Sequence, residues 1–177
     1  MVGAASGSLG PIDLLVHSAG VAEVGTHQEI DFATWRRVMA VNLDGTFLTV
    51  MAVKDGMIER GYGRIVCLAS IAGLRPRPTM LAYGTSKAGV IAFARSCSEA
   101  FAPQIRINCI APGLIDTDMP AASLTDATRQ RMIDATPLRR IGQPEEMAEV
   151  ALFLLSERSS FITGQVIAAD GGRVTLP

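Results

Sequence analysis

The chain has 177 residues, of which 49% are hydrophobic and 19% are charged, and its formal net charge is −1. This balance predicts a soluble globular protein and gives no electrostatic argument for binding to nucleic acid or to an anionic membrane surface. No apolar run reaches the roughly 18 residues of a membrane-spanning helix, and the N-terminus shows no basic segment followed by an apolar signal region. A chain of 177 residues has the length of one domain, and we expect a single domain over residues 1–177.

The cysteines and histidines indicate neither a disulfide framework nor a metal centre. Cys67, Cys97 and Cys109 are odd in number and widely spaced, which is typical of reduced, buried thiols in a cytoplasmic protein. His17 and His27 are the only histidines, too few for a convincing metal site. We expect a cytoplasmic protein without a bound metal.

The chain begins with a glycine-rich segment, Gly3 to Gly10. It superficially resembles the turn that binds the phosphates of a dinucleotide, but such a turn lies between a strand and a helix. Here no strand precedes the glycines, and the apolar run at Ile12 follows too soon. We expect Val2 to Leu9 to be a helix that leads into a strand, with no role in cofactor binding.

Four short apolar runs, rich in β-branched residues, predict buried parallel strands. Long segments with helical patterns separate the first three runs. Alternating strands and helices predict an α/β fold, a Rossmann-like doubly wound parallel sheet with helices on both faces. The runs are Ile12 to Val16, Arg64 to Ala69, Ile105 to Ala111 and Gln165 to Ala169.

Two long helices are expected between the first three strands. The first begins with Asp31 or Thr34 as its N-cap and continues to about Glu59, where glycines follow. The second runs from about Leu81 to Phe101 and ends before a proline.

Two further helices are expected before the last strand. The segment from Ser123 to Asp126 resembles a capping box with aspartate at its fourth position, and predicts a short helix to about Ala135. Another helix begins near Pro144, because proline suits the first helical position and the acids that follow suit the helix dipole.

Tyr83 and Lys87 stand four residues apart in the second long helix, so the phenol and the ammonium share one face. A nearby positive charge lowers the pKa of a phenol, which ordinarily titrates near pH 10, and makes it a better proton shuttle at neutral pH. The alternative is a half-exposed tyrosine followed by a solvated lysine. The chain has only two tyrosines and two lysines, so this spacing rarely arises by accident.

Ser70, Pro112-Gly113 and Asp170-Gly171-Gly172 each follow the end of a predicted strand. In open α/β sheets, ligands bind beyond the carboxyl ends of the strands. We expect these segments to border the site that contains Tyr83.

In the order and spacing of these motifs, the sequence resembles the classical short-chain dehydrogenase/reductase family, in the branch that includes 3-oxoacyl-carrier-protein reductases. The resemblance extends over essentially the whole chain. The motifs that carry it are His17-Ser18-Ala19-Gly20, Val41-Asn42-Leu43, Ser70, Tyr83 with Lys87, Pro112 to Thr117, Gly164-Gln165-Val166 and Asp170-Gly171-Gly172.

The resemblance implies an oxidoreductase that transfers hydride between NAD or NADP and a small carbonyl or alcohol substrate. Tyr83 would exchange a proton with the substrate oxygen, and Ser70 would bind that oxygen. Lys87 would lower the pKa of Tyr83 and hold a ribose hydroxyl of the cofactor, while Asn42 would anchor a water relay to the lysine. Structural alternatives stay open for two of them: Asn42 as a helix cap or kink, and Ser70 as a strand terminator.

The resemblance also implies the cofactor-binding residues. Ala19 and Gly20 would let the cofactor approach the main chain closely. The backbone of Pro112, Gly113 and Ile115, with the Thr117 hydroxyl, would receive the nicotinamide carboxamide, although Thr117 could instead cap a turn. The stretch from Met119 to Met132 would be a substrate lid or an ordinary surface helix. A homo-oligomer, dimer or tetramer, is expected by analogy.

The sequence departs from the family pattern at its front. A complete member begins with a strand, a glycine-rich turn and two more strand–helix units, whereas this chain would retain about four strands. We therefore expect weakened or lost cofactor binding, and an open hydrophobic edge at Ile12 to Val16. The alternative function is a non-catalytic fragment or interaction subunit. His17 is a smaller departure, because asparagine is common there.

Overall fold

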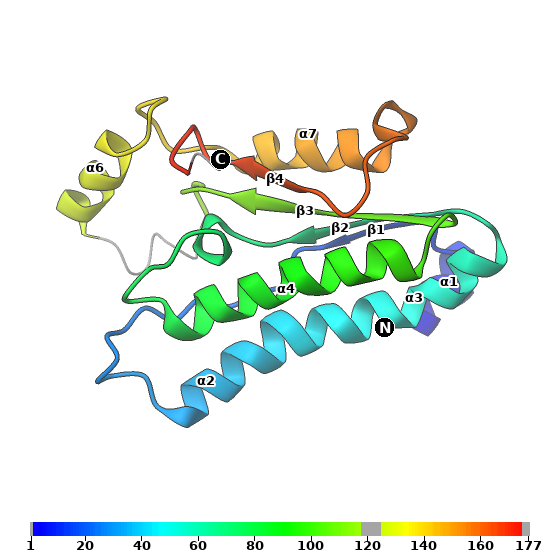
Figure 1. Cartoon of the computed structure of the whole chain (residues 1–177), viewed down its shortest axis with the longest axis horizontal. Coiled ribbons are helices and arrows are strands. Elements are labelled where there is room, and N and C mark those ends of the chain that lie inside the picture. Colours follow the sequence, from blue (N-terminus) through cyan, green and yellow to red (C-terminus); the bar gives the residue numbers. More distant parts are fainter. Residues whose placement is uncertain (1, 118–124, 175–177) are drawn as a thin grey trace.

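The computed structural model describes residues 2–117 and 125–174 of the chain. Four parallel strands form one sheet in the order β1-β2-β3-β4 (Figure 1). All four predicted strands are confirmed, with ends within two residues of expectation, and so is the α/β fold class. The strands are β1 Leu14–His17, β2 Gly63–Leu68, β3 Ile105–Pro112 and β4 Val166–Ala169.

Helices cover both faces of this sheet. Helices α3 (Gly45–Glu59) and α4 (Leu81–Ala100) pack against one face, and α7 (Pro144–Leu155) packs against β2 and β3 on the other (Figure 1). The predicted second long helix and the helix that begins at Pro144 are therefore confirmed. The Glu146 carboxylate accepts a 2.7 Å hydrogen bond from the Gln143 N–H, which completes a capping box at the start of α7.

The first long helix is interrupted by a π-helical turn. It consists of α2 (Phe32–Met39), the π-turn η1 (Ala40–Asp44) and α3, in direct succession. Asp31 is its N-cap, since the carboxylate accepts a 2.7 Å hydrogen bond from the Thr34 N–H. The sequence pattern predicted the length of this helix but not the π-turn, a feature that is frequent at functional sites.

The shorter elements lie at the ends of the sheet. Residues Val2–Leu9 form α1, as expected, and Thr125 caps α6 (Asp126–Asp134) through a hydrogen bond that its hydroxyl accepts from the Thr128 N–H. The expected capping residue Ser123 and the first part of the expected lid lie outside the described residues. The 3-10 turns are η2 Ile71–Gly73 and η3 Glu157–Ser159.

Alternate residues of the strands supply two hydrophobic layers. Ile65, Ile107 and their neighbours pack against α3 and α4, while Val66 and Ile110 pack against Leu154 of α7. Cys67, Cys97 and Cys109 are free thiols in the larger layer. Among residues 2–117 and 125–174, no helix has the length and apolar character needed to cross a membrane.

Strand β1 is an edge of the described sheet, and one of its faces is open. Leu15 packs into the layer beneath α3 and α4, so Leu14 and Val16 point to the opposite face. Because α7 lies over β2 and β3, Leu14 and Val16 are left 50% and 44% exposed. The predicted open hydrophobic edge is confirmed.

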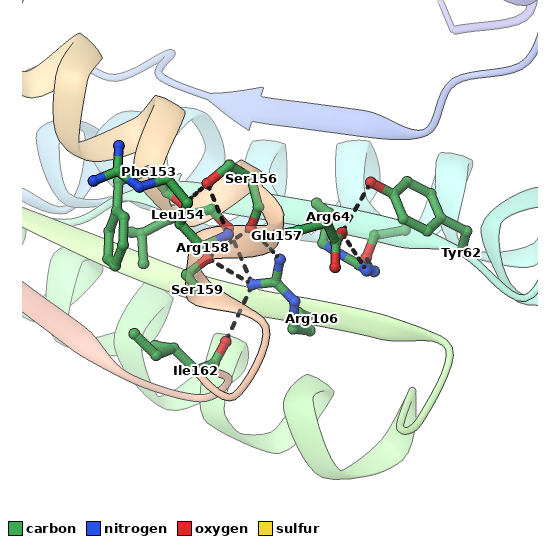
Figure 2. A network of polar contacts seen from close by, with 11 residues as sticks. Tyr62, Arg64, Arg106, Phe153, Leu154, Ser156, Glu157, Arg158, Ser159 and Ile162 are labelled. Atoms are coloured by element: carbon green, nitrogen blue, oxygen red, sulfur yellow. Dashed lines mark hydrogen bonds and ion pairs between the residues drawn. The ribbon is translucent and has the colours of Figure 1, made fainter.

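A buried arginine connects β3 to the end of α7. The guanidinium of Arg106 donates hydrogen bonds to the carbonyl oxygens of Leu154, at 3.1 Å, and Ser156, at 2.9 Å (Figure 2). It also donates to the Ser159 hydroxyl at 3.0 Å. Because the carbonyls at a helix C-terminus carry partial negative charge, Arg106 stabilises the end of α7.

Candidate functional site

Ser70 is placed by a tight contact between η2 and α4. It caps η2 directly after β2, and its hydroxyl accepts a 3.1 Å hydrogen bond from the Ala72 N–H. At Gly73, a Cβ would lie 2.7 Å from the carbonyl carbon of Lys87, closer than real Cβ atoms approach. The glycine therefore lets η2 lie directly on the backbone of α4, and this contact brings Ser70 to Tyr83.

Tyr83 and Lys87 share a face of α4, as the four-residue spacing predicts. The Lys87 ammonium lies 5.8 Å from the centroid of the Tyr83 ring. Lys87 is only 5% exposed, and its Nζ donates a 2.7 Å hydrogen bond to the carbonyl oxygen of Leu68, the last residue of β2. The alternative of a solvated lysine is therefore wrong.

The pKa values of these side chains differ from the sequence-based expectation. Burial raises the pKa of Tyr83, and a hydrogen bond with the Ser70 side chain opposes this by lowering it. Burial lowers the pKa of Lys87 from 10.5 to about 8. In the ligand-free chain the pKa of Tyr83 is therefore raised and not lowered, because desolvation by burial is the largest cause and it is the Ser70 side chain, not Lys87, that opposes it.

Asn42 lies within the π-turn η1 and is fully buried. Its amide Nδ2 donates hydrogen bonds to the Val21 carbonyl and to the Ser86 hydroxyl, both at 2.9 Å. Its Oδ1 accepts a 2.8 Å hydrogen bond from the Val21 N–H. The Ser86 hydroxyl in turn donates to the Tyr83 carbonyl at 2.8 Å. Asn42 thus ties the loop after β1 to the helix that carries Tyr83.

Gly20 lies directly beside this cluster. A Cβ at position 20 would be 3.3 Å from both Lys87 Nζ and Asn42 Oδ1. Glycine therefore leaves open a space next to the ammonium that a larger residue would fill. Ala19, the preceding residue, is exposed.

The segment after β3 is held against the end of β4 and the start of α7. At Gly113 a Cβ would lie 2.8 Å from the Cα of Asp170, so the end of β3 and the end of β4 are in close contact. Ile115 forms a parallel bridge with Gly142. The bridge uses the Asp116 N–H and the Leu114 carbonyl, so the N–H and C=O of Ile115 point the other way. Thr117 is exposed at the end of this described segment.

A cavity of about 540 Å³ lies between this segment, the N-terminal half of α7 and the end of β4. Ile115, Met147 and Val150 contribute to its apolar wall, and Arg140 and Glu146 form an ion pair at 2.6 Å beside it. Ser70, Tyr83 and Lys87 do not line it. Among the residues that the structure describes, no cluster of histidine, cysteine and acidic side chains could hold a metal ion.

His17 is a buried residue of the site to which sequence reasoning assigned no role. It ends β1 opposite Cys67 and is 7% exposed. Burial and the charge of Lys87 both lower the pKa of His17. The sequence signal for it was a histidine at a position where the family commonly has asparagine.

A protein-family model described as Enoyl-(Acyl carrier protein) reductase matches residues 1–173 of the chain. The chain is 41% identical over 175 residues to the "Inactive 2-(S)-hydroxypropyl-CoM dehydrogenase 2" of Xanthobacter autotrophicus, which covers 96% of this chain and 76% of that protein. It is 42% identical over 162 residues to the 3-oxoacyl-[acyl-carrier-protein] reductase of Chlamydia trachomatis, covering 91% of this chain and 65% of the reductase.

Two solved structures are similar in fold. The 3-oxoacyl-[acyl-carrier protein] reductase from Brucella melitensis superposes with a TM-score of 0.90 at 37% identity, over 97% of this chain and 67% of that one. The gluconate 5-dehydrogenase from Burkholderia cenocepacia, in complex with NADP and tartrate, gives a TM-score of 0.93 at 32% identity, over 97% and 68%. This chain thus spans about two thirds of the length of these reductases. The chain belongs to the short-chain dehydrogenase/reductase family.

Proposed function

We propose that this chain provides the catalytic part of an NAD(P)-dependent oxidoreductase that acts on a small carbonyl or alcohol, with Asn42, Ser70, Tyr83 and Lys87 as its catalytic residues. One observation supports this most. Tyr83, Ser70 and the buried Lys87 come together beyond the carboxyl end of β2, where ligands of such sheets bind, and the Ser70 side chain lowers the pKa of the Tyr83 phenol.

The raised pKa of Tyr83 suits a proton donor. At neutral pH the phenol keeps its proton, so Tyr83 can give it to a carbonyl oxygen that Ser70 also binds. With a pKa of about 8, Lys87 is mostly charged at pH 7 and stabilises the tyrosinate that this transfer leaves. Asn42 holds the loop after β1 against α4 and so keeps Lys87 beneath Tyr83.

The space beside Lys87 fits the nicotinamide riboside of NAD or NADP. Gly20 keeps the ammonium accessible to a ribose hydroxyl, and Ala19 lies beside it on the surface. The outward N–H and C=O of Ile115 suit a carboxamide, with Pro112, Gly113 and Thr117 on either side. When bound, the nicotinamide supplies or accepts the hydride.

The catalytic proposal is tested by replacing each of the two tyrosines. Tyr83→Phe should lower turnover of a ketone substrate by at least about 100-fold, the size expected for loss of a general acid. Tyr62→Phe, which changes the surface tyrosine, should leave turnover unchanged. Turnover that survives in Tyr83→Phe would exclude the proton-donor role.

Measurement of cofactor binding distinguishes the proposed enzyme from the alternative, a non-catalytic fragment. We expect calorimetry to detect NADH or NADPH binding to the wild-type chain, weakened by Gly20→Val because the added side chain meets Lys87 and Asn42. No heat at millimolar cofactor would favour the fragment.

We further propose a homo-oligomer, a dimer or tetramer. Support comes from large exposed apolar side chains on α3 and after α7: Phe47 is 46% exposed, Leu48 is 64% exposed and Phe161 is fully exposed. Light scattering should therefore give a mass above that of one chain. The three free buried thiols are consistent with the cytoplasm, the location that we propose.

A further inference from the structure

His17 has a buried hydrogen-bonding atom without a partner. Its Nε2 has no hydrogen-bond partner among the described residues, and the whole residue is 7% exposed. Nearly all buried polar atoms in native proteins are hydrogen-bonded to protein or to ordered water, because an unpaired one costs free energy. The imidazole is therefore expected to have a partner that is not a protein atom of the described chain.

Lys87 has more hydrogen-bond donors than it has acceptors among the described residues. An ammonium carries three donors, and among the described residues the Lys87 Nζ has one acceptor, the Leu68 carbonyl at 2.7 Å. The side chain is nevertheless buried at 5% exposure. Donors without acceptors on Lys87 and an unpaired ring nitrogen on His17 thus occur in one buried region.

The arrangement of the strands brings the two side chains near each other. His17 pairs with Cys67 in the sheet, and the residue after Cys67 is Leu68, whose carbonyl binds Lys87. The positive charge of Lys87 acts on the imidazole and, with burial as the larger cause, lowers the pKa of His17. At neutral pH the ring is therefore neutral, and one of its nitrogens can accept a hydrogen bond.

We propose that His17 is a positioning residue for Lys87: its neutral ring accepts, through one bridging water, a hydrogen bond from the ammonium that Leu68 alone does not satisfy. This contact favours the charged form of Lys87 and fixes its direction beneath Tyr83. The proposal deepens the proposed function, because it assigns a role at the same site. The other titratable groups that face this pair are the phenol of Tyr83, whose ring centroid lies 5.8 Å from the Lys87 ammonium, and the thiols of Cys67 and Cys109.

The two lysines and two histidines of the chain make the test direct. In ligand-free protein labelled with ¹³C-lysine, the Cε signal of Lys87 should titrate near pH 8, and Lys54 provides the reference signal. Because the water-bridged hydrogen bond favours the charged form of Lys87, its loss in His17→Leu should lower the Lys87 midpoint by about one pH unit. His17→Asn, whose amide can still accept a hydrogen bond, should restore most of it. His27→Leu, at the exposed histidine, is the matched control and should change nothing.

Two results would overturn the proposal. A Lys87 midpoint that does not move in His17→Leu, or that moves equally in His17→Leu and His17→Asn, would mean that His17 only fills space. If His17→Leu does not fold, the reciprocal variant decides. In Lys87→Met, loss of the charge should raise the His17 midpoint in ¹⁵N-histidine spectra, and an unchanged midpoint would exclude coupling between the two.

These measurements need neither cofactor nor turnover, so they separate two kinds of failure. Coupled titration in a chain that binds no NAD(P) would refute the proposed function and keep the role of His17. Catalysis by Tyr83 without coupling between His17 and Lys87 would do the reverse.

Discussion

Replacement of Gly73 by alanine should separate Ser70 from Tyr83. The new Cβ would lie 2.7 Å from the Lys87 carbonyl carbon and 2.8 Å from the Ala88 nitrogen, whereas ordinary contacts begin at 3.4 Å. Both atoms belong to the backbone of α4, a long helix that packs against the sheet, so η2 must move, by about 0.7 Å or more. Overpacking of this kind costs about 1–3 kcal/mol of unfolding free energy. For a chain of this size, that corresponds to a decrease of roughly 2–12 °C in melting temperature.

The same displacement should change the titration of Tyr83. The Ser70 hydrogen bond lowers the pKa of Tyr83, so its loss in Gly73→Ala should raise that pKa further. Ultraviolet absorbance of the phenolate measures this in a Tyr62→Phe background, where Tyr83 is the remaining tyrosine. Gly3→Ala, at a helical position where a Cβ meets nothing within 4 Å, is the control. A Gly73→Ala variant with the melting temperature and Tyr83 titration of its parent would refute the reasoning.

Three other changes test separate parts of the structure. Arg106→Met should lower the unfolding free energy by about 3 kcal/mol, because buried carbonyls at the end of α7 lose their donor; a chemical denaturation curve that matches the one for exposed Arg158→Met would contradict this. Lys87→Met should raise the melting temperature at pH 7. The folded-state pKa of about 8 lies below the ordinary 10.5, so unfolding takes up protons in this window and wild-type stability rises with pH through it. The difference in melting temperature between Lys87→Met and wild type should therefore shrink between pH 8 and 10.5. A difference that stays constant over this range would count against burial of the Lys87 charge. For Glu146, Arg140 and the Gln143 N–H lower the pKa from 4.5 to about 2. The difference in melting temperature between wild type and Glu146→Gln should therefore be constant above about pH 5 and vanish toward pH 2; a difference that persists at pH 2 would be evidence against the ion pair and cap.

The strands and the helix caps could be predicted from sequence because their causes are local. The run from Ile105 to Ala111 is apolar enough to be recognised as a buried strand without knowledge of its neighbours, and Asp31 is a common N-cap type. The Tyr83–Lys87 spacing fixed a shared helix face for the same reason. Their pKa values could not be predicted, because these depend on burial by η2 and β2, which come from other parts of the chain.

The role of Arg106 was missed although the sequence contains a signal for it. Arg106 and Asn108 alternate with Ile105, Ile107 and Cys109, which indicates that one face of β3 meets polar partners. The Asn108 amide does so, since it binds the Ile162 carbonyl at 3.0 Å. Those partners are backbone groups at the end of α7 and in the segment between α7 and β4, and no side-chain pattern in the sequence identifies them.

The π-turn at Asn42 has a consequence for any change in the length of the chain there. Each residue of a helix advances the side-chain direction by about 100°, so the additional residue in η1 sets the rotation of α3 relative to α2. Deleting one residue would satisfy every local preference for a regular α-helix. It would nevertheless turn Val50, Val53 and Met57 away from the sheet and bring exposed neighbours such as Leu48 to new positions. An insertion or deletion at this turn is therefore a rotation of the downstream helix, and its tolerance depends on the whole hydrophobic layer.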